Sequence, residues 1–197
     1  MPSANAIKED LIQSQILQAA HQLFQKHGFQ KVSMDDVAKA IGKGRSSLYY
    51  YYKSKDEVFD AVIDAEIKEI LNEIGRAMEK VPTTEEKIRA YCTAKIRIAR
   101  KRRSFLQAVE AGMNADEMSQ YVQKKMGIHK RMIGEETALL RQVLAVAPSS
   151  QKLDTVIFVL LSSLRGLKEQ LFVTNDFSHV DAAIDTLTRM TVQELKK

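Results

Sequence analysis

The sequence has little of what would cross-link, kink or anchor a chain. Its 197 residues include one cysteine, three prolines, eight glycines and no tryptophan. A single cysteine, Cys92, excludes an internal disulfide and fits a reducing compartment. The longest unbroken apolar run, Val156–Leu161, is six residues, against the roughly 20 that a membrane-spanning helix needs. The first residues lack the basic and then apolar pattern of a secretory signal, so we expect a cytoplasmic protein with no membrane partner.

What is present indicates a folded chain of ordinary size. Hydrophobic residues make up 45% of the sequence and charged residues 28%. These values exclude a disordered chain, a collagen-like fibre and a disulfide-stapled miniprotein. The length suits one domain or two small ones that share a border.

The apolar residues recur at helical spacing, and no segment alternates long enough to indicate a strand. We therefore predict an all-α protein. Nine helices are expected, at about residues 4–27, 33–42, 45–51, 54–78, 84–102, 104–112, 116–146, 150–174 and from 178 onward.

Several of these helices have recognisable start signals. Ser33 with Asp36, Ser54 with Glu57, and Thr83 with Glu86 resemble capping boxes, in which two side chains satisfy free backbone N–H groups. Ser104 with Gln107 is taken as a further start signal of the same kind. No Gly-rich or Ser-rich linker follows Ser54, so the helix that begins there must join the first part of the chain to the rest.

The net charge of +5 is concentrated at one end of the chain. Residues 1–55 carry eight basic and four acidic side chains, a net charge of +4, and the remaining 142 residues carry +1. This asymmetry indicates that the first part meets a polyanion and that the body has another task.

Two short helices separated by a glycine-containing turn, residues 33–42 and 45–51, have the spacing of a helix-turn-helix. At about 100° per residue, Leu48 and Tyr52 of the second helix face the core. Ser46, Tyr49 and Tyr50 face outward, and Tyr51 lies on the flank.

The outward side chains suit a DNA duplex. Arg45 can form a bidentate contact with guanine, and serine and tyrosine hydroxyls can reach a base edge or a phosphate. Lys55 lies in the first turn of the next helix, where free backbone N–H groups favour an anion. The alternative is a solvated turn in a helical bundle, with the tyrosines packed between helices.

Residues 8–60 also resemble the DNA-binding head of the TetR family of bacterial transcriptional regulators. The resemblance is carried by Gly28-Phe29, by Ser33-Met-Asp-Asp-Val37-Ala38-Lys-Ala-Ile41-Gly42, and by Ser47-Leu48-Tyr49-Tyr50-Tyr51-Tyr52-Lys-Ser54-Lys55-Asp56. The family's turn commonly runs Gly-Val-Ser-x-Gly-Thr. Here it is Gly42-Lys43-Gly44-Arg45-Ser46-Ser47, which adds a cation near the DNA backbone.

This resemblance implies a cytoplasmic homodimer that binds a palindromic operator, usually represses, and releases DNA when a small molecule enters the C-terminal body. It implies a DNA-binding domain at residues 1–55, with a helix-turn-helix in a three-helix head, and a helical ligand-binding and dimerisation domain at 56–197. The DNA-binding residues expected are Ser33, Lys43, Arg45, Ser46, Ser47, Tyr49, Tyr50, Tyr51 and Lys55.

The helix of about 150–174 is apolar around nearly its whole circumference and needs cover on all sides. We expect it and the last helix to pack against their copies in a second subunit, with intrachain burial as the alternative. The interface residues expected are Val159, Ser162, Gly166, Ile184 and Leu187.

Methionines are crowded between residues 113 and 132, and their pliable side chains suit a cavity of adaptable shape. We take this region as one wall of a pocket for a small-molecule effector, with ordinary core filling as the alternative. The pocket residues expected are Tyr91, Phe105, Met113, Met118, Met126 and Phe158.

Features of an enzyme are lacking. The sequence contains no HExxH, GxSxG, P-loop or paired CxxC motif, and His21 and His27 are six apart, so they cannot share a metal from one helix face. We expect no catalytic residue, metal or cofactor.

The run Arg100–Arg103 is read as a solvated helix end or as an attractor for an anionic effector. Two other functions remain open, a helical small-molecule carrier and an architectural protein that binds DNA without sequence preference.

Overall fold

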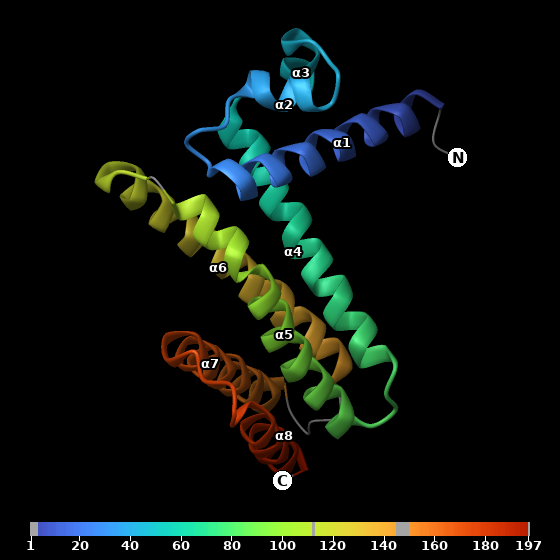
Figure 1. The fold of residues 1–197 in the computed structure, drawn as a ribbon. Helices are drawn as coiled ribbons and strands as arrows, with labels where there is room; N and C mark the ends of the chain where they lie inside the picture. The colour runs from blue at the N-terminus through green and yellow to red at the C-terminus, as the bar shows by residue number, and fades with distance from the viewer. Residues whose placement is uncertain (1–3, 112, 145–149, 197) are drawn as a thin grey trace. The chain divides into compact units, whose positions relative to one another are not determined.

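The helical pattern of the sequence reappears in the computed structural model, which describes residues 4–111, 113–144 and 150–196. Within these residues the chain forms eight α-helices and no β-strand (Figure 1). Their bounds are α1 Ala4–His27, α2 Met34–Ala40, α3 Arg45–Tyr51, α4 Lys55–Glu79, α5 Thr84–Glu110, α6 Ala115–Val143, α7 Ser150–Thr174 and α8 Val180–Lys196.

One predicted helix start is wrong. Ser104 does not begin a helix, because α5 continues without interruption from Thr84 to Glu110. No glycine or proline lies between these two residues, and an exposed serine is tolerated inside a helix that tertiary packing holds. The predicted helix of about 116–146 ends at Val143 as α6, and its residues 145–146 lie outside the described residues.

The capping signals at Ser33 and Thr83 are confirmed. The hydroxyl of Ser33 accepts a hydrogen bond from the backbone N–H of Asp36 at 3.2 Å, and the Asp36 carboxylate accepts one from the backbone N–H of Ser33 at 2.9 Å. Thr83 and Glu86 form the same pair of bonds at 3.2 and 3.1 Å. Local sequence therefore decides where α2 and α5 begin.

Two glycines adopt the left-handed backbone that ends a helix. Gly28 follows α1 with φ of +80°, and its N–H donates to the carbonyl of Phe24 at 2.9 Å. Gly42 follows α2 with φ of +65°. A side chain at either position would be strained, so these glycines turn the chain at both ends of the segment that contains α2.

The chain divides into two compact units. The first comprises residues 1–68 and 102–125, and the second comprises residues 69–101 and 126–197. The helices α4, α5 and α6 each contribute residues to both. The expected functional border at residue 55 is a different division, and it stays a prediction.

The core of the first unit is built around α1. A cluster of three aromatic rings, Phe24, Phe29 and Phe59, has centroid distances of 5.0 to 5.8 Å. The buried side chains around it include Ile16, Ala20, Val37, Leu48, Val58, Val62, Phe105 and Val109. Leu48 is completely buried, so the core fixes which face of α3 points inward.

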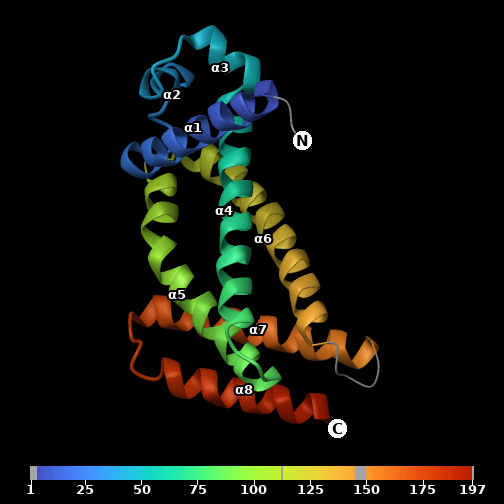
Figure 2. The same ribbon diagram turned by 90° about the vertical axis from the view of Figure 1, so that its right-hand side faces the viewer.

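The core of the second unit joins parts of five helices. In this unit α7 and α8 run antiparallel and side by side (Figure 2). Its fully or nearly fully buried side chains include Ile74, Met78, Ile88, Tyr91, Cys92, Leu140, Leu144, Ile157, Leu160, Leu164 and Ile184. None of the helices among the described residues is both long enough and apolar enough to cross a lipid bilayer.

Candidate nucleic-acid interface

The segment α2–turn–α3 is a helix-turn-helix. The turn is held by the N–H of Gly42, which donates to the carbonyl of Lys39 at 3.0 Å, and by the N–H of Lys43, which donates to Ala38 at 2.9 Å. Gly44 is the N-cap of α3 and offers no side-chain cap. The N–H of Ser47 instead donates to the backbone carbonyl of Gly44 at 3.0 Å.

Leu48 marks the inner face of α3 and Tyr50 its outer face, whereas Tyr52 follows the helix as its C-cap. Leu48 is buried in the core, and Tyr52 is half-buried. Burial raises the pKa of Tyr52. On the other face Tyr50 is 67% exposed, and its ring meets that of Tyr51 edge-on at 5.0 Å.

The remaining predicted DNA-binding residues of this segment differ in exposure. Lys43, Arg45 and Ser46 are exposed, and Ser47, Tyr49 and Tyr51 are half-buried. The turn and the outer face of α3 therefore bring these side chains onto one continuous segment of the surface. Their contact with DNA stays a prediction.

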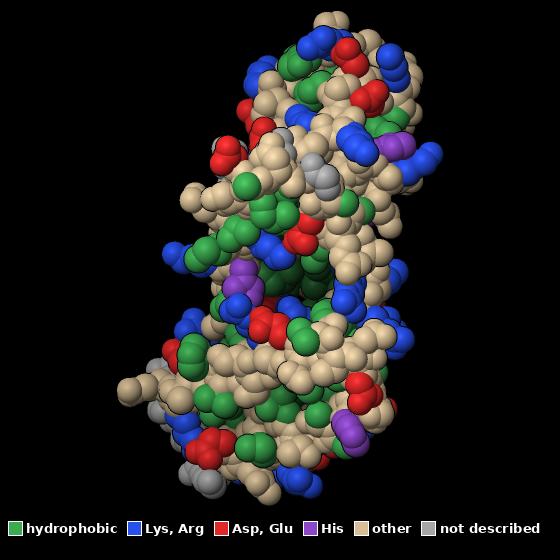
Figure 3. Space-filling view, turned by 60° about the vertical axis from the view of Figure 1, so that its left-hand side comes forward, with side chains coloured by type: hydrophobic (Ala, Val, Ile, Leu, Met, Phe, Trp, Pro, Cys, Tyr) green, Lys and Arg blue, Asp and Glu red, His purple; other side chains and the backbone are tan. Residues whose placement is uncertain are grey.

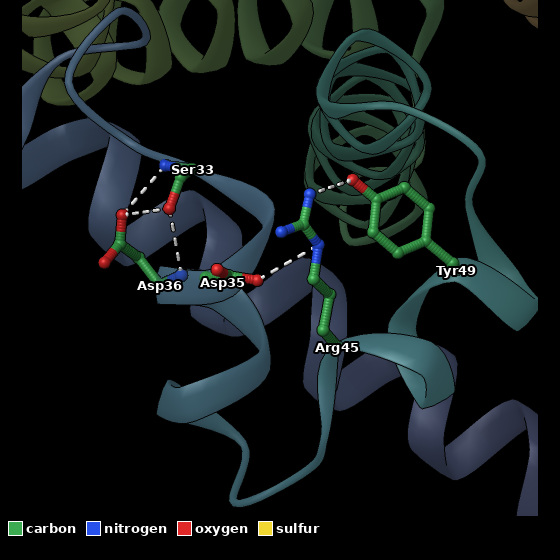
Figure 4. Close-up of polar contacts among 5 residues, drawn as sticks. All are labelled: Ser33, Asp35, Asp36, Arg45 and Tyr49. Carbon is green, nitrogen blue, oxygen red and sulfur yellow. Dashed lines mark hydrogen bonds and ion pairs between the residues drawn. The ribbon is translucent and has the colours of Figure 1, made fainter.

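Arg45 is held from two sides (Figure 4). Its Nη2 donates a hydrogen bond to the hydroxyl of Tyr49 at 3.3 Å, and its Nε lies 3.3 Å from a carboxylate oxygen of Asp35. The bond to Tyr49 and then the charge of Asp35 raise the pKa of Arg45 above its ordinary value. Sequence reasoning missed Asp35, because its pairing with Arg45 depends on how the turn brings α2 and α3 together.

Ser33 is fully engaged by its capping role. Its hydroxyl donates to the carboxylate of Asp36 at 2.6 Å and accepts from the Asp36 backbone N–H. These bonds from Ser33 lower the pKa of Asp36. Ser33 is exposed at the start of α2, so a phosphate contact would have to share a hydroxyl that already caps the helix.

Lys55 has a structural partner that the sequence did not reveal. Its ammonium donates to the backbone carbonyls of Phe29 at 3.0 Å and Gln30 at 3.3 Å. It also lies 4.4 Å from the centre of the Phe29 ring. Lys55 therefore connects the start of α4 to the turn after α1. Its second role, as a phosphate anchor, stays a prediction.

The surface of the head carries charges of both signs. On the face drawn in Figure 3, Lys and Arg side chains alternate with Asp and Glu at the top of the view, where α2 and α3 lie. On this face the basic side chains therefore do not form a uniform patch. Acidic side chains beside basic ones restrict where a phosphate can approach.

The structure does not bring the six predicted pocket residues together within either unit. Tyr91 is buried in the second unit, whereas Phe105 is buried in the first, where its ring stacks on that of His21 at 4.4 Å. Met113 and Met118 are half-buried in the first unit. Met126 and Phe158 are 69% and 70% exposed, and the part of either side chain in a ligand pocket stays a prediction.

A surface hollow of about 350 Å³ lies elsewhere in the second unit, along the end of α4 and the start of α5. Its floor is made of small side chains, including Ala77, Ala90 and Ala94. Arg89 and Arg97 also line it, and they form ion pairs with Asp185 and Glu73. None of the six predicted pocket residues contributes to it.

The five predicted interface residues fall into two groups. Val159, Ser162 and Gly166 are exposed on one face of α7. Ile184 is buried in the core of its own chain, and Leu187 is half-buried against that core, so their contact with a second subunit stays a prediction. The periodicity of α8 could not tell a face that packs on α7 from one that packs on a partner.

The basic run in α5 is not a solvated helix end. Arg102 is paired with Glu66 in the first unit and is largely buried. Arg100 lies 4.6 Å from the centre of the Phe177 ring in the second unit. The run lies inside α5 and not at its end, so the reading as a helix end is wrong, although Arg100 and Lys101 are exposed to solvent.

Sequence reasoning also missed a buried ion pair in the second unit, between Lys95 of α5 and Glu136 of α6. Burial, together with the charge of Lys168, lowers the pKa of Lys95 to about 7. One turn earlier on α5, the hydroxyl of Tyr91 is buried and has no hydrogen-bond partner among the residues that the structure describes. A polar group left unpaired in a core costs about 1–3 kcal/mol.

Comparisons with known proteins agree with this geometry. The family of bacterial regulatory proteins of the tetR type matches residues 16–62. The HTH-type transcriptional regulator YhgD of Bacillus subtilis (strain 168), itself uncharacterized, is 36% identical over 64 residues. That stretch covers 32% of this chain and 34% of YhgD, so the match spans about a third of the relative's length.

Two solved structures share the fold over nearly the whole chain. A TetR-family transcriptional regulator from Mesorhizobium loti superposes with a TM-score of 0.69 at 16% identity, covering 98% of each chain. The flavonoid-responsive regulator FrrA superposes with a TM-score of 0.64 at 21% identity, covering 92% of this chain and 95% of its own. At these identities the likeness shows that both the head and the body share an all-helical fold with the two structures.

Proposed function

We propose that this chain, whose residues 16–62 match the TetR family of bacterial regulatory proteins, is a sequence-specific DNA-binding transcriptional regulator. The observation that carries the proposal is the arrangement of α3. Leu48 anchors its inner face in the core, while Arg45, Ser46 and Tyr50 stand exposed on the segment that follows the turn. A helix presented in this way fits the major groove, with base edges read by its first residues.

The regulator acts as a homodimer on a palindromic site in the bacterial cytoplasm. Support comes from α7, where Phe158 and Val159 are 70% and 52% exposed, next to Ser162 and Gly166. No atom outside the helix lies within 4 Å of a Cβ built at Gly166, so a partner helix can approach closely there. On α8, Met190 is another large apolar side chain that is exposed, at 61%. Two-fold symmetry would place the reading helices about 34–36 Å apart, one turn of B-form DNA.

A small-molecule effector controls DNA binding. The protein is a repressor that leaves its DNA site when the effector binds. The unpaired hydroxyl of Tyr91 supports a ligand in the second unit, because a polar group on the ligand would remove the cost of burying it. FrrA is by name responsive to flavonoids. An effector can shift the protein from DNA only if it binds the released form more tightly. The continuous helix α4, which contributes to both units, is the element that transmits the shift.

Selection of duplexes from a random library, followed by electrophoretic shift in excess competitor DNA, tests the proposal. A regulator selects a palindrome and stays bound in the presence of the competitor. A carrier binds no duplex, and an architectural protein binds the competitor as well as the selected duplex. Either of the last two results overturns the proposed function.

The dimer has its own test. Phe158→Asp places a charge on the exposed face of α7 and should yield a folded monomer with weakened binding to the palindrome, measured by sedimentation and shift assay. Gln151→Asp, an exposed position at the start of the same helix, is the matched control. A Phe158→Asp protein that remains dimeric contradicts the interface.

A further inference from the structure

Two neighbouring carboxylates in the first turn of α2 have different partners (Figure 4). Asp36 accepts hydrogen bonds from the backbone N–H and the hydroxyl of Ser33, so it is committed to the start of its own helix. Asp35 instead points across the turn toward Arg45. The capping box explains Asp36, and it leaves Asp35 without a role in α2.

The contact between Asp35 and Arg45 is an ion pair without a hydrogen bond. Arg45 Nε and Asp35 Oδ1 are 3.3 Å apart, and Oδ1 is shielded from solvent with no hydrogen-bond donor in the described part of the chain. The two side chains are 64% and 46% exposed overall. Arg45 is thus held by the charge of Asp35 and by a hydrogen bond to Tyr49, while Nη1 takes part in neither contact.

This arrangement treats the two kinds of acceptor on DNA differently. A phosphate that approached Arg45 would place a second anion beside the Asp35 carboxylate, and like charges at close range repel. The O6 and N7 atoms of guanine are neutral acceptors, so Arg45 can donate to them while Asp35 still balances its charge. A bidentate contact with guanine is worth about 1–3 kcal/mol of discrimination, whereas an exposed ion pair is worth about 0–1 kcal/mol.

We propose that Asp35 is a specificity-determining residue, which keeps Arg45 from pairing with the phosphates of any duplex and reserves it for the base edge of a guanine. The proposal rests on the proposed function, because it requires that α3 lies in the major groove. Asp35 raises specificity by weakening binding to wrong sequences, not by adding a contact to the right one.

The test is Asp35→Asn, which removes the charge and keeps the shape of the side chain. Binding is measured over a series of salt concentrations on a random-sequence duplex and on the duplex that the unsubstituted protein selects. On random DNA we expect affinity to rise about two- to fivefold, the effect of releasing one exposed ion pair. The slope of log affinity against log salt should steepen by about one, because Arg45 gains a phosphate. On the selected duplex the affinity and the salt slope should change less. The ratio of the affinity for the selected duplex to the affinity for random DNA should therefore fall.

Two further variants separate this effect from a general change in charge. Asp10→Asn removes the same charge from an exposed position on α1 and should leave the affinity ratio unchanged. In an Arg45→Ala background, Asp35→Asn should no longer steepen the slope on random DNA. Circular dichroism melting of each variant checks that α2 and the head remain folded.

The outcomes are distinct. A slope that Asp35→Asn leaves unchanged, or one that it steepens equally without Arg45, overturns the role of Asp35 while the proposed function stands. If the unsubstituted protein selects no sequence at all, the proposed function fails, and the role of Asp35 fails with it.

Discussion

Gly28 offers a sharp test of how the first unit is packed. Its φ of +80° is a conformation that side chains rarely adopt, and a left-handed backbone costs an alanine about 1–2 kcal/mol. A Cβ built at Gly28 would also lie 3.0 Å from the carbonyl oxygen of Ala108 and 3.1 Å from that of Ala111. Backbone oxygens cannot rotate away, so the end of α1 and the end of α5 would have to separate, at a further cost of about 1–3 kcal/mol. We therefore expect Gly28→Ala to lower the free energy of unfolding of the first unit by about 2–5 kcal/mol.

Two other glycines are matched controls. Gly42 has a φ of +65°, but no atom lies within 4 Å of a Cβ built there, so Gly42→Ala should cost only the backbone strain of about 1–2 kcal/mol. Gly75 lies inside α4 and is equally unobstructed, so Gly75→Ala should stabilise the helix by up to about 1 kcal/mol.

Urea denaturation followed by circular dichroism gives the three free energies, and amide hydrogen exchange in α1 assigns the Gly28 effect to the first unit. Gly28→Ala must be the most destabilising of the three substitutions. Equal costs at Gly28 and Gly42 would mean that α1 does not end against the carbonyls of α5, and the description of the first unit would be refuted.

Three further predictions concern single side chains. Lys55→Ala should lower the melting temperature of the head, because the bonds from a charged donor to the turn after α1 are worth roughly 1–2 kcal/mol. It should also weaken binding to all duplexes and lower the salt slope by about one if Lys55 serves a phosphate, and an unchanged slope removes that role. Ser33→Ala should raise the pKa of Asp36, followed by NMR titration, toward its ordinary value of 3.8. The folded-state pKa of this carboxyl is lowered, so the stability it contributes is present above about pH 4 and is lost as the pH falls further, and the Ser33→Ala variant should lose less on acidification. Burial raises the pKa of the Cys92 thiol to about 12, so iodoacetamide at pH 8 should label it only when urea unfolds the second unit, and rapid labelling of the native protein would contradict its burial.

The sequence by itself determined the local structure of this protein and the character of its head. Helical spacing of apolar residues, capping pairs such as Ser33 with Asp36, and glycine at positions 28 and 42 act within a few residues of chain. Their energies are local, so their effects could be predicted before any tertiary contact was known. The inward face of α3, marked by Leu48, follows from the same periodicity.

Only the tertiary structure decided which side chains meet across the chain. The ion pair of Asp35 with Arg45 and the bonds from Lys55 to the turn at Phe29 join residues whose spacing carries no signal. The same holds for burial. Ile184 faces its own core and Phe158 faces solvent, although both lie on apolar stripes. A hydrophobic stripe indicates that one face of a helix must be buried. Whether that face packs on another helix of the same chain or on a partner depends on the three-dimensional structure.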